Sequence, residues 1–398
     1  MIAKPASHLA RHALRGARLA AAGAALMMGL AGWPVAQAAA KPAGTLVYIG
    51  THGGKAPGQG IFSVRLDPKT GVLSDLEFAA GVERPTWLVV DPKRPVLYAV
   101  SETGNDGKSQ GGVYSLAIDP KTGWLKTINH VQSGGSGATF LSYDSRLSTV
   151  FVANFGGGAV SAVPVEADGM LGPVSSTQVD TGSGPLPRQK SPHAHASVID
   201  PTGHFVLAPD LGADRVFVYR VDPATKALSA GDPPFVATGP GTGPRHLVFS
   251  PDGRFAYLDT ELSAQLFVFK WDAAAGQLTP VQNLPIDKPD FKGERSAAEL
   301  AVSKDGRFLY MSDRGANTLQ VYAINKKTGT VTQRQEIAGG GDIPWSFGID
   351  PTGRWMIVAN ENSSTLSVFK IDRTSGKLTP TGQSLAVFKP VAIAFYPQ

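Results

Sequence analysis

Residues 244–261, PRHLVFSPDGRFAYLDTE, contain two apolar stretches of alternating polarity separated by SPDG. Alternation with a period of two residues is typical of a β-strand with one buried face. The Pro and Gly of SPDG suit a tight reversal, so the stretch predicts a strand, a turn and a second strand. The pattern recurs at residues 86–102, 195–211, 298–314 and 345–361.

A second motif, a short turn, occurs seven times. Its copies are DPKTGVL (67–73), DPKTGWL (119–125), VEADGML (165–171), DPATKAL (222–228), DAAAGQL (272–278), NKKTGTV (325–331) and DRTSGKL (372–378). Gly71 of the first copy recurs in every copy except the fourth, which has Lys226. Glycine adopts the positive φ that such a turn requires. Seven units of about 50 residues predict an all-β fold, a seven-bladed β-propeller with four-stranded antiparallel blades.

Each end of this repeat array contains a strand pattern without a partner beside it. KPVAIAFYP (389–397) resembles a first strand, and TLVYIGTH (45–52) resembles a second strand. We expect these N- and C-terminal strands to share one blade, which closes the ring and removes two exposed edges. The propeller is therefore expected to span residues 44–398, preceded by a linker at 39–43.

The first 38 residues have the pattern of a secretory signal peptide. A basic start precedes an apolar centre at residues 19–33, and the segment ends in Ala36-Gln37-Ala38, a cleavage pattern. The alternative is a membrane anchor, for which the apolar run is short. We therefore expect a periplasmic or secreted protein with no membrane association after cleavage.

Removal of this leader also removes most of the positive charge. The whole chain has a formal charge of +5, and the leader carries four Lys or Arg and no Asp or Glu, so the mature chain has 5 − 4 = +1. A nucleic-acid partner is therefore not expected. The chain has no Cys, which excludes disulfides and thiol catalysis.

In a four-stranded blade, the start of the first strand and the end of the second lie on the same face of the ring. The first-strand positions are Thr86, Thr139, His195, Arg245, Ala298, Trp345 and Val391. The second-strand positions are His52, Glu102, Phe155, Leu211, Glu261, Arg314 and Glu361, each preceded by one of Thr51, Ser101, Asn154, Asp210, Thr260, Asp313 and Asn360. One mouth thus collects two guanidinium groups, a carboxylate and an imidazole, a pattern suited to a small, oxygen-rich, anionic ligand.

We interpret His195, Arg245, Glu261 and Arg314 as catalytic candidates. The substrate-binding candidates are His52, Glu102, Asn154, His193, Asp210, His246, Asp313, Trp345, Asn360 and Glu361. Among these, His193 competes with His195 for its place, His246 is expected to point off the ring face, and Trp345 to form a wall. Structural explanations stay open, since Glu261 and Arg314 can form an ion pair between blades. No ligand spacing requires a metal, and no cofactor is expected.

Five segments resemble the seven-bladed propeller lactonase family, which includes bacterial propeller-type 6-phosphogluconolactonase and fungal 3-carboxy-cis,cis-muconate lactonising enzyme. They are YIGTH (48–52), GPRHLVFSPDGRFAYLDTEL (243–262) and residues 191–221, 297–322 and 344–372, so the resemblance covers essentially all of the predicted propeller. The family's proposed site, a His, an Arg, a Glu and a second Arg, falls on His195, Arg245, Glu261 and Arg314. The chain departs from the family at His52, where members often have an aromatic hydroxyl.

The resemblance implies hydrolysis of a sugar lactone, and these residue types suit that chemistry. Opening a lactone requires an activated water and stabilisation of an oxyanion. We expect Glu261 to act as general base, with His195 the next candidate, and Arg245 and Arg314 to face the negative charge. No G-x-S-x-G motif is present, so a covalent acyl-enzyme is not expected.

The predicted export favours an unphosphorylated substrate, because sugar phosphates are cytoplasmic. A sugar lactone such as glucono-1,5-lactone then fits better than 6-phosphogluconolactone. Two alternatives stay open: cycloisomerisation of a carboxymuconate, and a non-catalytic propeller that binds a ligand or a protein at its rim. The sequence leaves the oligomeric state open.

Overall fold

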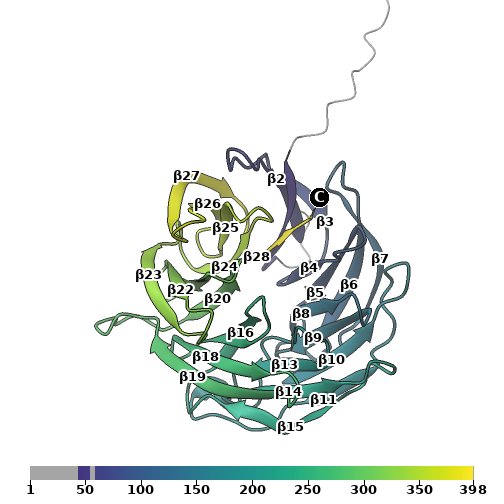
Figure 1. Ribbon diagram of the computed structural model, residues 1–398. Coiled ribbons are helices and arrows are strands. Elements are labelled where there is room, and N and C mark those ends of the chain that lie inside the picture. Colours follow the sequence, from purple (N-terminus) through teal and green to yellow (C-terminus); the bar gives the residue numbers. More distant parts are fainter. Residues whose placement is uncertain (1–43, 54–58, 398) are drawn as a thin grey trace, which may run out of the picture. The chain divides into compact units, whose positions relative to one another are not determined.

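The computed structural model describes residues 44–53 and 59–397. Within them, 28 strands form seven four-stranded antiparallel sheets, arranged as blades around a common centre (Figure 1). This arrangement confirms the predicted seven-bladed propeller. The predicted signal peptide and linker lie outside the described residues. No helix in the described part of the chain is long and apolar enough to span a bilayer.

Six blades use four consecutive strands each, numbered from the centre outward. Blade two contains β4 (Leu88–Val90), β5 (Val96–Ser101), β6 (Gly112–Ile118) and β7 (Leu125–Gln132). Blade three contains β8 (Ala138–Asp144), β9 (Thr149–Asn154), β10 (Ala159–Pro164) and β11 (Ser176–Val179). Blade four contains β12 (Val198–Ile199), β13 (Phe205–Asp210), β14 (Arg215–Val221) and β15 (Leu228–Ala237). Blade five contains β16 (Pro244–Phe249), β17 (Phe255–Thr260), β18 (Gln265–Asp272) and β19 (Gln277–Pro285). Blade six contains β20 (Ala297–Val302), β21 (Phe308–Asp313), β22 (Thr318–Ile324) and β23 (Val331–Ala338). Blade seven contains β24 (Pro344–Ile349), β25 (Trp355–Asn360), β26 (Thr365–Ile371) and β27 (Leu378–Ala386). A single 3-10 turn, η1 (Pro187–Gln189), is the one helical element among these residues.

The first blade combines the two ends of the repeat array. It contains β28 (Pro390–Phe395), β1 (Thr45–Thr51), β2 (Ile61–Leu66) and β3 (Glu77–Ala80). The innermost strand β28 pairs antiparallel with β1, from the pair Val47 and Phe395 to the pair Thr51 and Pro390. The predicted closure of the ring by a shared blade is therefore confirmed.

The repeated turn motif connects the third and fourth strands of each blade. In the first copy the carbonyl of Asp67 accepts a hydrogen bond from the amide of Gly71 at 2.8 Å, and Gly71 has φ of +74°. Lys226 stands at the same place with φ of +62° and makes the same bond to Asp222. The turn geometry thus tolerates a side chain at a backbone conformation that glycine adopts without strain.

The hydrophobic core lies between neighbouring blades. The buried apolar side chains form seven clusters in the described residues, and each cluster joins two adjacent blades. One of them, for example, packs Tyr48 of β1 against Leu97 of β5. Because each blade buries one face against each neighbour, all seven must be present for the core to be complete.

Candidate active site

The first strands of several blades begin with an irregular register. Pairing shifts between Pro244 and Leu247 in β16, and corresponding shifts occur at the starts of β8, β20 and β24. A β-bulge of this kind redirects side chains at the end of a strand. It explains why Arg245 and His246, which are adjacent in sequence, both line the same pocket. The expectation that His246 points off the ring face was wrong for this reason.

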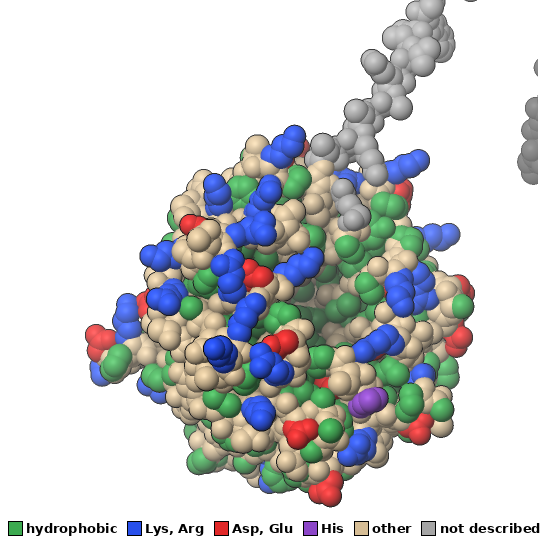
Figure 2. Space-filling model, in the orientation of Figure 1, with side chains coloured by type: hydrophobic (Ala, Val, Ile, Leu, Met, Phe, Trp, Pro, Cys, Tyr) green, Lys and Arg blue, Asp and Glu red, His purple; other side chains and the backbone are tan. Residues whose placement is uncertain are grey.

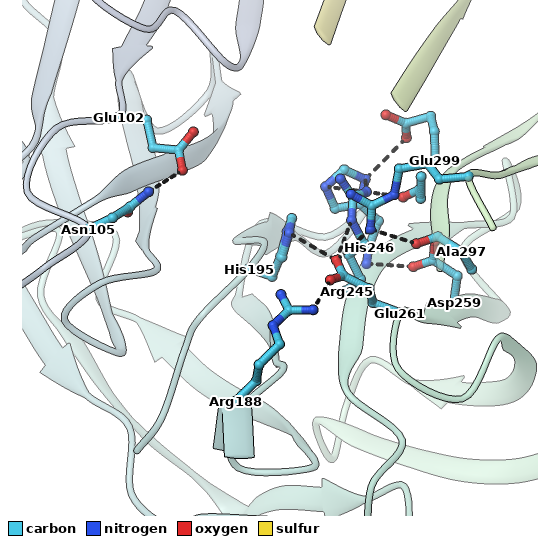
Figure 3. Close-up of polar contacts among 12 residues, drawn as sticks. Glu102, Asn105, Arg188, His195, Arg245, His246, Asp259, Glu261, Ala297 and Glu299 are labelled. Carbon is cyan, nitrogen blue, oxygen red and sulfur yellow. Dashed lines mark hydrogen bonds and ion pairs between the residues drawn. The ribbon is translucent and has the colours of Figure 1, made fainter. Parts of the chain in front are cut away.

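Five blades contribute to this central pocket. Its lining residues are Thr86, Trp87, Glu102, Thr139, His195, Arg245, His246, Trp345 and Ser346. Figure 3 shows Glu102 on one side of the central opening and His195, Arg245 and Glu261 on the other. Five of the seven predicted first-strand positions, all except Ala298 and Val391, therefore line this pocket.

Glu261 is the hub of the polar contacts on one wall. It directly follows β17, and its backbone amide donates to the carbonyl of Gly243 at 2.7 Å. Its Oε2 lies 2.7 Å from Arg314 Nη2 and 3.2 Å from Arg245 Nε, and its Oε1 accepts from Arg188 Nη1 at 2.7 Å. Its Oε2 is also 3.9 Å from His195 Nε2. The other three predicted catalytic candidates thus each lie within 4 Å of the Glu261 carboxylate.

The charges in this cluster determine its protonation. Burial by itself would raise the pKa of Glu261, but Arg314 and Arg245 outweigh burial and hold that pKa well below its ordinary value. Burial and the charge of Arg245 lower the pKa of His195 well below 6.5. At neutral pH the site therefore contains an ionised carboxylate and a neutral imidazole beside two guanidinium groups.

Trp345 packs against the guanidinium groups from the seventh blade. The guanidinium carbon of Arg314 lies 4.4 Å from the ring centroid of Trp345, and that of Arg245 lies 5.8 Å away. Arg245 also donates to the carbonyl of Ala298. The predicted wall is thus a ring face that orients two cations.

Several buried polar atoms at this site have no hydrogen-bond partner among the described residues. They are Thr86 Oγ1, His195 Nδ1 and Arg314 Nε. Buried polar groups are normally satisfied, and an unsatisfied group requires an explanation. A hydroxyl, an imidazole nitrogen and a guanidinium N–H left without partners are suited to bind an oxygen-rich ligand.

The opposite wall is acidic. His52 Nδ1 lies 3.3 Å from Glu361 Oε1, and Lys389 Nζ donates to the same oxygen at 3.2 Å. The His52 ring also meets Trp345 edge-on, with ring centroids 4.7 Å apart. Glu102 accepts a hydrogen bond from Asn105 at 2.6 Å. Three predicted binding residues, His52, Glu102 and Glu361, therefore lie together across from the Glu261 cluster.

Four predicted substrate-binding residues lie elsewhere. They are the last residues of their second strands, Asn154, Asp210, Asp313 and Asn360. All are fully buried inside the blades; Asn154, for example, bonds the hydroxyls of Ser133 and Ser161 at 2.6 and 3.1 Å. Adjacent residues of a strand point to opposite sides, so these side chains face away from the residues that follow them. Their interpretation as pocket residues is corrected accordingly.

His193 also contributes to structure rather than to the pocket wall. Its ring stacks on Phe155 with centroids 4.7 Å apart, and its Nδ1 lies 2.8 Å from the carbonyl oxygen of Phe155. His195 therefore holds the pocket position for which both residues were candidates.

Two groups at the site were missed from the sequence. Arg188, in η1, reaches Glu261 from the connection between β11 and β12. The longest interval between turn motifs, from 169 to 226, marks that connection as extended and was the available signal. The buried acids Asp259 and Glu299 lie beside His246, whose backbone amide donates to Asp259 at 2.6 Å and whose Nδ1 is 3.3 Å from Glu299.

No group of three or more His, Cys, Asp or Glu side chains in residues 44–53 and 59–397 is arranged to hold a metal ion. A larger pocket, with a cavity volume of about 520 Å³, lies at the far ends of β20 and β24, between the turns that contain Asp305 and Pro351. Its walls are mainly apolar and include Phe308 and Tyr310. The central pocket is the candidate site because of its chemistry rather than its size.

The fold and this His–Arg–Glu–Arg cluster define a propeller protein with a polar central site. The chain belongs to the lactonase family of seven-bladed β-propellers, whose family model matches residues 46–395. It is 32% identical to a 6-phosphogluconolactonase of Bacillus subtilis over 305 residues, 77% of this chain and 85% of that protein. It is 36% identical to a 6-phosphogluconolactonase of Pectobacterium carotovorum over 63% of this chain and 66% of that protein.

Among solved structures, the periplasmic gluconolactonase PpgL of Pseudomonas aeruginosa is similar with a TM-score of 0.84 and 37% identity. That match covers 89% of this chain and 99% of the other. A solved structure from Bacteroides fragilis matches with a TM-score of 0.82 and 29% identity, over 90% of this chain and 99% of the other.

Proposed function

We propose that this protein hydrolyses an unphosphorylated sugar lactone, such as glucono-1,5-lactone, to the sugar acid outside the cytoplasm. Membership of the lactonase family and the names of its relatives support lactone hydrolysis as the class of reaction. The observation that carries the proposal is the pair of buried guanidinium groups beside an unsatisfied imidazole in a pocket shared by five blades.

Arg245 and Arg314 are suited to stabilise the oxyanion that forms when water adds to the lactone carbonyl. A guanidinium keeps its proton in proteins, so its positive charge is present throughout the reaction. The Nε of Arg314 has no acceptor among the described residues and is available for an oxygen of the substrate. Glu261 holds both guanidinium groups in place through its Oε2.

The structure argues against the expected role of Glu261 as general base. An efficient base has a pKa near the working pH, whereas the surrounding cations lower the pKa of Glu261 well below its ordinary range. Both of its oxygens are already bonded to guanidinium groups. We therefore assign Glu261 an orienting and charge-balancing role, and His195 a role in binding the substrate or the water.

The charge balance favours a neutral substrate over a phosphorylated one. The cations around the pocket, Arg84, Arg188, Arg245, Arg314 and Lys389, each lie within 4 Å of a carboxylate. A phosphate group is best bound by cations that are free to form charge-assisted hydrogen bonds. The same reasoning disfavours a carboxymuconate, which carries several carboxylates, and the likeness to a periplasmic gluconolactonase supports the same choice.

A panel of lactones tests the proposal by acid release at constant pH. We expect turnover of glucono-1,5-lactone, weaker turnover of 6-phosphogluconolactone and no cycloisomerisation of carboxymuconate. Arg314→Ala should lower kcat/KM by about 10²–10³-fold, the usual effect of removing an oxyanion donor. Arg254→Ala is the matched control. Arg254 is exposed, forms an ion pair with Asp252 and lies just before β17, at the end of that strand opposite to Glu261. Absence of turnover with every lactone, together with tight binding of a sugar acid, would favour a binding protein instead.

A further inference from the structure

Two of the carboxylates around the central opening, Glu261 and Glu102, differ in how many hydrogen bonds their oxygens accept. Glu261 contacts three guanidinium groups and His195, all within 4 Å. Glu102, across the opening in Figure 3, lies within 4 Å of Arg84 and His52, but among the described residues it accepts one hydrogen bond, from Asn105 to its Oε1. Glu102, on the wall that holds none of the four catalytic candidates, is therefore the carboxylate that accepts fewer hydrogen bonds.

The second oxygen of Glu102 is positioned but not saturated. Its Oε2 lies 3.7 Å from Arg84 Nη2 and 4.0 Å from His52 Nε2, beyond the distance of a good hydrogen bond. The side chain is 11% exposed, so it is held in the wall but still reaches the pocket that it lines with His195 and Arg245. Oε2 is therefore available to accept a hydrogen bond from a water molecule.

His52 is fixed in a geometry that supports this carboxylate. Glu361 contacts its Nδ1, and the edge of its ring packs on Trp345, so its Nε2 is directed towards Glu102. A carboxylate that orients one imidazole nitrogen and leaves the other facing a reacting group is the arrangement used in catalytic triads. Here the imidazole faces a second carboxylate, and it is suited to hold Glu102 in position.

We propose that Glu102 is the general base of the reaction, with Asn105 and His52 as its positioning residues. This inference rests on the proposed lactone hydrolysis. Glu102 takes a proton from water as the water oxygen bonds to the carbonyl carbon. The bond between that carbon and the ring oxygen then breaks, and the proton passes to the ring oxygen, which leaves as a hydroxyl. Water and lactone are consumed, and one hydroxy acid is formed.

The experiment compares Glu102→Gln with Glu166→Gln, an exposed glutamate in a turn at the other end of a blade. The Gln side chain keeps an oxygen that can accept the hydrogen bond from Asn105, but it cannot take a proton from water. We expect Glu102→Gln to lower kcat about 10²–10⁴-fold with little change in KM, the range of general-base catalysis. Glu166→Gln should match the wild type.

Rescue by a small carboxylate separates a chemical role from a structural one. Added formate should restore part of the activity of Glu102→Ala, which creates space for it, and should not affect Arg314→Ala. A Glu102→Gln variant that folds, by circular dichroism, and retains activity within threefold overturns the inference. So does a Glu102→Ala variant whose activity formate does not restore. If the wild type opens no lactone, the proposed function itself fails.

Discussion

Glu299 provides a quantitative test of the electrostatics beneath the site. It lies on β20, where its Oε1 accepts from the amide of Leu300 at 3.1 Å and contacts His246 Nδ1 at 3.3 Å. Its Oε2 has no partner among the described residues. Burial raises the pKa of Glu299 from 4.5 to about 8, although Arg245 acts in the opposite direction. The folded protein therefore holds a protonated carboxyl group at neutral pH.

The sign of the effect follows from proton binding. Between pH 4.5 and about 8 the folded state keeps the proton of Glu299 and the unfolded state does not, so stability falls as pH rises. At about 1.4 kcal/mol per pH unit, the free energy of unfolding loses about 5 kcal/mol across this window. The stabilising contribution is fully present below pH 4.5 and is absent above pH 8.

Glu299→Gln removes this dependence, because Gln is close in shape and stays neutral. We expect the variant and the wild type to be similar at pH 4.5, and the variant to be more stable by up to about 5 kcal/mol at pH 9. Urea unfolding followed by circular dichroism at several pH values measures the difference, with the exposed Glu166→Gln as control. Parallel curves for Glu299→Gln and the wild type would refute the reasoning.

Three further predictions concern closure, turns and acid pairs. Deleting residues 388–398 removes β28 and should abolish cooperative thermal unfolding; an unchanged melting curve would contradict ring closure. Gly276→Ala should destabilise by a few kcal/mol in urea unfolding, because φ is +71° and the added Cβ would lie 2.4 Å from the Phe205 ring. Lys226→Gly, by contrast, should stabilise by up to about 1 kcal/mol, and a neutral Gly276→Ala would show that the turn can adjust. Burial and the facing Asp210 raise the pKa of Asp180, so Asp180→Asn should gain stability over the wild type at pH 8 but not at pH 4; an equal effect at both values would contradict this.

The repeats in the sequence were sufficient to predict the fold. The turn motif around Gly71 and the strand pairs such as residues 244–261 have fixed spacing, and both follow local rules of alternation and turn chemistry. The shared first blade also followed, because each end of the array contained an unpaired strand. Positions counted from the turns correctly brought His195, Arg245, Glu261 and Arg314 together.

The remaining errors arise where local rules no longer apply. Strict alternation along the strand predicted that His246 points off the ring face. The bulge in β16 instead turns its side chain into the pocket beside Arg245. The side chains of Asn154 and Asp210 form hydrogen bonds that fix the ends of their strands, and residue type alone does not distinguish this role from one in the pocket. Arg188 belongs to a long connection whose path depends on tertiary packing. The protonation of Glu261 depends on three cations from different blades, so no local pattern reports it.

The closing strand β28 links the completion of the fold to the completion of the pocket. Glu102 comes from the blade that follows the joint and Trp345 from the blade that precedes it, and the last residues of the repeat array lie between them. A ribosome must therefore synthesise β28 before these walls can meet. Products that end before β28 should present the open edge of β1 to proteases, and enzyme activity in a cell extract should count only molecules that contain β28.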